Sequence, residues 1–331
     1  MTVKKFAFAD KLKGMPHVLY TNVQGRHGRK HFIEYNMRLQ GWKFTRIELP
    51  LLKDMTEDFH KQLVGDYSEK SSIIINWYSS QILDLLRKWL DDTKGTDEPY
   101  IILMEDDYDV RISDYWNFSW DYMMEQLPYG WDCIQLGFES PDVVPFYLHP
   151  TKPEYSLGAT LMSRHYAEKL LDLHYIDGKY KFDNVIANSV YMNRDSGIHD
   201  GMTFEGTSGS PDYFLAQSGN CYSLPLIPIV PYFTGISDAG VNGMDTIDDS
   251  KWKPRPSFLK CYKAYWEWWT QDRDNFTADE FFSYGKDNDN LMERNISQWS
   301  DQYFIKQASH QRSEFLNRFG LVLNNHGIQG S

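Results

Sequence analysis

Three consecutive acidic side chains, Glu105, Asp106 and Asp107, have the type and spacing to bind a cation. They follow the apolar run 100–104 (YIILM) without a break. Carboxylates at alternate positions of an extended turn can face the same side, so Glu105 and Asp107 are expected to share one ligand. Carboxylate oxygens suit Mg²⁺ or Mn²⁺ and leave coordination positions open for phosphate oxygens. The run therefore predicts a divalent-cation site; the alternative is a solvated acidic patch.

A second set of candidate side chains lies at the end of the apolar run 17–22 and in the polar loop that follows it. Asn22, Arg26 and Arg29 are expected to contact the base and phosphates of a nucleotide, because guanidinium groups bind oxyanions with two parallel hydrogen bonds. The alternative for the two arginines is a solvated loop. Asp106 is expected to turn toward the ribose of that nucleotide or toward a backbone partner.

The elements around these residues follow from hydrophobic spacing. Residues 17–22 and 42–50 are expected to be strands and residues 30–40 a helix, which together form a βαβ unit. Residues 72–90 carry the clearest helical pattern. The run 100–104 is apolar throughout, which is typical of a central strand buried on both faces. Such sheets bind ligands beyond the carboxyl ends of their strands, and the acidic run begins at that end.

The middle of the chain continues to alternate between strand and helix. A helix is expected over 113–127, a buried strand over 131–138 and a strand, turn and helix within 156–173. A polar insert of about 175–210 follows, then a short helix from Asp212 and a late, proline-broken strand.

Composition changes after about residue 250. Residues 1–250 are expected to form one α/β domain, and residues 251–331 a helical, aromatic-rich extension. Trp266, Trp268 and Trp269 cluster in this extension. They cannot all lie on one helical face, so at least one is expected at an interface.

Charge and composition exclude several classes of protein. The 331 residues include 34 Lys and Arg against 46 Asp and Glu, a net charge of −12 that opposes a long polyanion such as DNA. The three cysteines lie far apart, which excludes a disulfide framework or zinc knuckle. No P-loop or HExxH motif is present. Without a signal peptide or membrane span in the sequence, a soluble cytoplasmic protein is expected.

Five stretches of the sequence carry a resemblance to a known family. They are residues 18–44 (from VLYTN to GWKF), 101–107 (IILMEDD), 131–138 (WDCIQLGF), 158–171 (GATLMSRHYAEKLL) and 211–228 (PDYFLAQSGNCYSLPLIP). In this order they resemble glycosyltransferase family 25, which includes lipopolysaccharide glycosyltransferases and procollagen galactosyltransferases. The chain departs from the family pattern at Asn76-Trp77, where a serine–histidine pair is usual, and in its longer insert.

The resemblance implies a GT-A type, Rossmann-like sandwich with a mixed, mostly parallel central sheet. It also implies an inverting, divalent-metal-dependent transfer of a hexose from a UDP-sugar donor to a hydroxyl of an unidentified glycan, lipid or protein acceptor. An inverting displacement needs a general base, and Asp212 matches the family's late aspartate. A plain helix N-cap is the alternative for Asp212, and Asp183 and Glu205 are reserve candidates for the base.

Further assignments remain open. A third metal ligand is expected from His199 or Asp238, without a choice between them. Ser163 and Arg164 align with a serine–arginine pair of the family, or they cap and brace the following helix. Two other functions compete with sugar transfer: a metal-dependent nucleotidyltransferase or phosphohydrolase that uses the same acids, and a non-catalytic module that binds nucleotide sugars.

Overall fold

A seven-stranded sheet is the centre of the molecule, with the strand order β2-β1-β4-β7-β5-β10-β6. The computed structural model describes residues 11–50, 59–64, 70–137, 148–151, 158–182, 215, 219–224, 226, 321–324 and 327–330. The strands are β1 (Val18–Val23), β2 (Phe44–Leu49), β4 (Tyr100–Glu105), β5 (Cys133–Gly137), β6 (His149–Pro150), β7 (Ala159–Ser163) and β10 (Cys221–Ser223).

The sheet is mixed, with most strands running in one direction. Strand β1 is parallel to β2 and β4, and β5 is parallel to β10. Strand β7 is antiparallel to both β4 and β5, so these two strands share a direction. Only β7 and the short β6 run the other way among the strands of this sheet. The expected Rossmann-like α/β fold with a mixed, mostly parallel sheet is confirmed.

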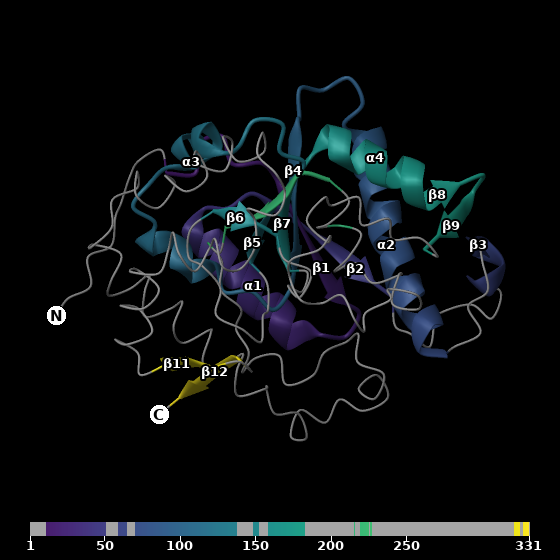
Figure 1. Cartoon of the computed structure of the whole chain (residues 1–331), viewed down its shortest axis with the longest axis horizontal. Coiled ribbons are helices and arrows are strands. Elements are labelled where there is room, and N and C mark those ends of the chain that lie inside the picture. The colour runs from purple at the N-terminus through teal and green to yellow at the C-terminus, as the bar shows by residue number, and fades with distance from the viewer. Residues whose placement is uncertain are drawn as a thin grey trace.

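Helices cover both faces of the sheet. On one face lie α1 (His27–Gln40) and α3 (Trp120–Gln126), and on the other lie α2 (Lys70–Asp92) and α4 (Arg164–His174) (Figure 1). A hydrophobic core lies on each face of the sheet, and β4 contributes to both because its alternate side chains point to opposite faces. Ile102 and Met104 belong to the α1 core, while Ile101 and Leu103 belong to the α2 core.

The expected helix over 113–127 is divided into two elements. A 3₁₀ helix, η3 (Val110–Tyr115), ends at Trp116, whose backbone is extended. Ser119 then caps α3 by accepting a hydrogen bond from the Tyr122 N–H at 3.2 Å. Trp116 and Trp120 are fully buried on either side of this break. Packing of the two large rings therefore overrides the helical spacing of the sequence.

Two small sheets accompany the main one. The expected polar insert begins with a hairpin of β8 (Tyr175–Ile176) and β9 (Lys179–Lys181). Strand β9 also pairs with β3 (Leu63–Val64), which follows the 3₁₀ helix η2 (Phe59–Gln62). In the extension, β11 (Leu321–Asn324) and β12 (Gly327–Gly330) form an antiparallel pair. At these residues the chain is strand, where helix was expected; the rest of 251–331 lies outside the described residues.

Candidate functional site

The carboxyl ends of β1 and β4 form the topological switch point of the sheet. From β1 the chain passes through α1 to β2 on one side and later reaches β4 on the other side of β1. The register pairs Thr21 with Glu105 and Asn22 with Glu48, so these side chains lie at one edge. Doubly wound sheets bind ligands in the crevice at this position. The predicted acidic run and first loop therefore meet where a ligand is expected.

Asp106 is the buried member of the acidic run and is tied to the first loop. The Asn22 Nδ2 donates to Asp106 Oδ2 at 2.5 Å, and the Arg29 guanidinium donates to Asp106 Oδ1 at 3.1 Å. The Arg29 and Asp106 side chains are only 11% and 6% exposed. A buried carboxylate needs such partners to offset its lost hydration. Asp106 thus joins the end of β4 to β1 and α1.

Arg46 fixes the orientation of the Asn22 amide. The Arg46 Nε donates to Asn22 Oδ1 at 2.9 Å, so Asn22 Nδ2 faces Asp106 and also reaches the carbonyl of Arg26 at 3.3 Å. Arg46 in turn forms an ion pair with Glu48. We call this chain of contacts the strand-end network; its members are Asn22, Arg29, Arg46, Glu48 and Asp106.

Arg46 and Glu48 were not among the site residues predicted from the sequence. The signal was present in β2, whose sequence FTRIEL alternates charged and apolar residues. Alternation places Arg46 and Glu48 on the same face of the sheet, toward Asn22 of the neighbouring strand. Their partner is distant in sequence, so the pattern alone indicated a polar face without indicating what it contacts.

Glu105 and Asp107 flank Asp106 without sharing its environment. Glu105 is exposed at the end of β4, and Asp107 is half-buried in the turn that follows. The part of the chain that the structure describes contains no group of three or more His, Cys, Asp or Glu side chains placed to hold a metal. Mg²⁺, however, is commonly held by one or two carboxylates together with substrate phosphates. Glu105 and Asp107 supply carboxylates of the kind and number that this chemistry requires.

The turn after the acidic run is held by its own contacts. Asp109 is fully buried, and it accepts hydrogen bonds from the Arg111 backbone N–H at 3.1 Å and from Arg111 Nε at 2.8 Å. Tyr108 is also buried, and a Cβ atom at Gly158 would collide with its hydroxyl group and with the Gly137 carbonyl oxygen. The ends of β4 and β5 and the start of β7 therefore pack closely at the candidate site.

Helix α1 is anchored to β1 through Tyr20 and Glu34. The Tyr20 hydroxyl donates to Glu34 Oε1 at 2.6 Å. Burial and this hydrogen bond raise the pKa of Tyr20, which keeps the phenol protonated. Burial alone acts to raise the pKa of Glu34, but hydrogen bonds from Tyr20 and Arg38 outweigh it, and the pKa of Glu34 is lowered. The pair fixes the helix that carries Arg29.

Ser163 and Arg164 lie at the opposite edge of the sheet. Because β7 is antiparallel to β4, helix α4 begins beside the amino end of β4. Ser163 caps α4 by accepting from the Tyr166 N–H at 3.2 Å. The Arg164 guanidinium lies 4.9 Å from the centre of the Trp89 ring and donates to the Glu98 carbonyl at 3.1 Å. Of the two open interpretations, these contacts show the capping and bracing role.

Several predicted residues lie outside the described part of the chain. They include Asp212, the reserve candidates for the base and both candidates for the third metal ligand: Asp183, Glu205, His199 and Asp238. Arg26 is described; it occupies the N-cap position of α1 without capping it through its side chain. None of the described helices combines the length and apolar composition that a bilayer crossing requires.

Comparison with known proteins gives a distant structural likeness. No protein-family model and no curated protein matches the chain. Among solved structures, it is similar to a glycosyltransferase involved in the glycosylation of the major capsid of PBCV-1, with 8% sequence identity and a TM-score of 0.27. The match covers 47% of this chain and 65% of that one, less than two thirds of its length. Membership of glycosyltransferase family 25 stays a prediction from the sequence.

Proposed function

We propose that the chain is an inverting, divalent-metal-dependent glycosyltransferase that moves a hexose from a UDP-sugar to a hydroxyl acceptor. The supporting observation is that Glu105 and Asp107 stand at the carboxyl end of β4, at the switch point, on either side of the anchored Asp106. Nucleotide phosphates bind at this position in doubly wound sheets. The order of the similar stretches in the sequence supports the choice of sugar transfer.

In this proposal Glu105 and Asp107 hold Mn²⁺ or Mg²⁺. The bound cation supplies Lewis acidity that offsets charge on a departing nucleoside diphosphate. Asp106 orients the two flanking residues, because its contacts with Asn22 and Arg29 fix the turn. Rigid support of this kind keeps ligand side chains in place.

Two further roles are assigned by sequence. Arg26 is proposed to contact the donor phosphates, since a guanidinium matches their geometry. Asp212 is proposed as the general base that deprotonates the acceptor hydroxyl on the face opposite the leaving group.

The deciding experiment measures release of nucleoside diphosphate from a panel of nucleotide sugars, with Mn²⁺ or with EDTA. We expect release that depends on the sugar nucleotide and is abolished by EDTA and by Asp107→Ala. Asp97→Ala is the matched control, because Asp97 is an exposed acid just before the amino end of β4. Asp212→Asn should retain donor binding and lose transfer.

The same assay separates the competing functions. Release from nucleoside triphosphates without a sugar indicates a nucleotidyltransferase or phosphohydrolase. Binding of nucleotide sugar with Mn²⁺ but without release indicates a non-catalytic module. Equal activity of Asp107→Ala and the wild type removes the metal assignment, and transfer by Asp212→Asn removes that residue from the base role.

A further inference from the structure

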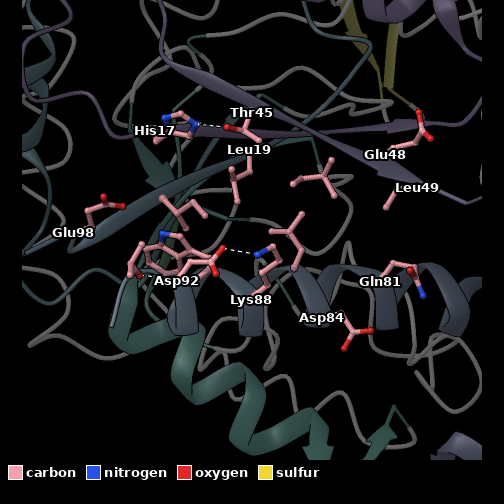
Figure 2. Close-up of a pocket in the computed structure, with 15 residues that line it drawn as sticks. His17, Leu19, Thr45, Glu48, Leu49, Gln81, Asp84, Lys88, Asp92 and Glu98 are labelled. Atoms are coloured by element: carbon pink, nitrogen blue, oxygen red, sulfur yellow. Dashed lines mark hydrogen bonds and ion pairs between the residues drawn. The ribbon is translucent and has the colours of Figure 1, made fainter. Parts of the chain in front are cut away.

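A groove of about 470 Å³ lies between the sheet and α2, and Glu48 of the strand-end network is part of its lining (Figure 2). One wall comes from β1, β2 and β4 and the other from α2 (Figure 2). Its size falls in the range of small-molecule sites. Its lining consists of His17, Leu19, Thr45, Ile47, Glu48, Leu49, Gln81, Asp84, Leu85, Lys88, Trp89, Asp92, Thr93, Glu98 and Ile101.

The groove shares a face of the sheet with Glu105. In β4, Ile101 lines the groove, and Glu105 follows it by an even number of residues, so strand alternation directs both to the α2 side. Leu49 lines the groove at the carboxyl end of β2, the edge that holds the candidate site. His17 and Glu98 line it near the amino ends of β1 and β4. The groove thus extends from the candidate site along the sheet.

The floor of the groove is apolar and its rim is polar. Leu19, Ile47 and Ile101 from the sheet face Leu85 and Trp89 from α2. Apolar walls with a few polar groups are typical of sites for small ligands, in which the polar groups set orientation. A ligand with one apolar side and several hydrogen-bonding groups fits such a lining.

Three of the four carboxylates that line the groove are held in ion pairs, and the fourth, Glu98, acts on His17. Lys88 Nζ lies 2.6 Å from Asp92 Oδ2, and the Arg87 guanidinium lies 2.7 Å from Asp84 Oδ1. Glu48 is paired within the strand-end network. Paired carboxylates still accept hydrogen bonds from hydroxyl groups, but they attract a cation only weakly, and they do not bind a polyanion. The rim therefore favours an uncharged, hydroxyl-rich ligand.

His17 adds a polar group at the far end of the groove. Its Nε2 lies 2.7 Å from Thr45 Oγ1. Burial lowers the pKa of His17, although Glu98 opposes this, while Lys43 adds to the lowering. A neutral imidazole beside a threonine hydroxyl can both donate and accept, which again matches hydroxyl groups.

We propose that this groove binds an uncharged saccharide, whose ring faces pack on the apolar floor while its hydroxyl groups bond to the rim. This assignment rests on the proposed function: the saccharide is the acceptor. Its reacting hydroxyl lies at the end of the groove lined by Leu49, beside the edge of the sheet that carries Glu105. Saccharide rings carry both apolar faces and dense hydroxyl groups, and the groove supplies partners for each.

The test is hydrogen–deuterium exchange by mass spectrometry on the full chain, without donor or Mn²⁺. The probes are maltotetraose, cellotetraose, chitotetraose and β-1,4-galactotetraose, with tetralysine and a sulfated tetrasaccharide as charged controls. We expect at least one neutral saccharide to protect peptides of β2 and the second half of α2. Gln81→Trp, which fills the groove, should weaken that binding by about tenfold or more.

Asp91→Trp is the matched control, because Asp91 is exposed on α2 and does not line the groove. It should bind as the wild type does, and thermal melts should show both variants folded. Failure of every neutral saccharide to protect these peptides, protection by tetralysine alone, or equal weakening in both variants overturns the proposal. Because donor and metal are absent, this outcome is independent of nucleoside diphosphate release, which tests the proposed function separately.

Discussion

Removal of the Asp106 carboxylate should destabilise the protein more than any other change in the acidic run. Asp106→Ala removes the carboxylate that accepts from the Arg29 guanidinium, whose side chain is only 11% exposed, and from the Asn22 amide. Truncation of one member of a buried ion pair costs about 3–5 kcal/mol. Glu105 is exposed, so Glu105→Ala should change the free energy of unfolding by less than about 0.5 kcal/mol.

Urea unfolding followed by circular dichroism measures both effects. A double-mutant cycle with Arg29→Met isolates the pair: the double variant should be more stable than the sum of the single losses indicates, with a coupling of about 1–3 kcal/mol. Asp97→Ala again serves as the control and should lie within about 0.5 kcal/mol of the wild type.

The two possible roles of Asp106 give opposite results. A direct contact with metal or ribose predicts lost donor binding with unchanged stability. The anchoring role predicts lost stability, together with weaker donor binding in proportion to the disturbed turn. A cost below about 1 kcal/mol for Asp106→Ala, with no coupling to Arg29, would refute the reasoning from burial.

Three other outcomes are expected. Gly158→Ala should lower the free energy of unfolding by about 1–3 kcal/mol in urea titrations, because the added Cβ collides with the Tyr108 hydroxyl. Gly28→Ala should raise it by about 0.5–1 kcal/mol, because the added Cβ on α1 meets no other atom. Burial raises the pKa of the Cys133 thiol, so its labelling by iodoacetamide in native buffer should be far slower than in urea. The pKa of His17 is lower in the folded protein than its ordinary value of 6.5, so the contribution of His17 to stability is fully present above pH 6.5. This contribution should be lost as the pH falls from 6.5 through the folded pKa, and His17→Gln should remove that part of the pH dependence of unfolding.

The sequence was sufficient to predict the elements that position the acidic run. Hydrophobic periodicity predicted β1, α1, β2 and the long helix α2, because each is amphipathic or fully apolar. The burial of residues 101–104 of β4 followed from the apolar run 100–104. Since strand ends carry the ligands in such sheets, the location of Glu105, Asp106 and Asp107 followed as well.

What the sequence did not predict depends on contacts between distant segments. The Arg46 contact with Asn22 joins residues 24 positions apart, and the Asn22 contact with Asp106 joins residues 84 apart. Neither leaves a local pattern. The break between η3 and α3 has the same cause, since Trp116 meets Leu226 through its indole N–H, 110 residues away. The secondary-structure propensity of a local segment carries no information about contacts between distant residues.

The alternation of side chains along β1, β2 and β4 has a consequence for how this protein can diversify. Asn22, Arg46 and Asp106 project from one surface of the backbone, while Leu19, Thr45 and Ile47 project from the other. Substitution of Leu19 or Ile47 therefore leaves the hydrogen bonds of Asn22, Arg46 and Asp106 in place, whereas Glu48 belongs both to the strand-end network and to the groove lining. Descendants of this sequence can therefore remodel the groove by point substitutions. A single residue inserted in any of these strands would turn the side chains after it to the opposite surface, and so disrupt both the strand-end network and the groove.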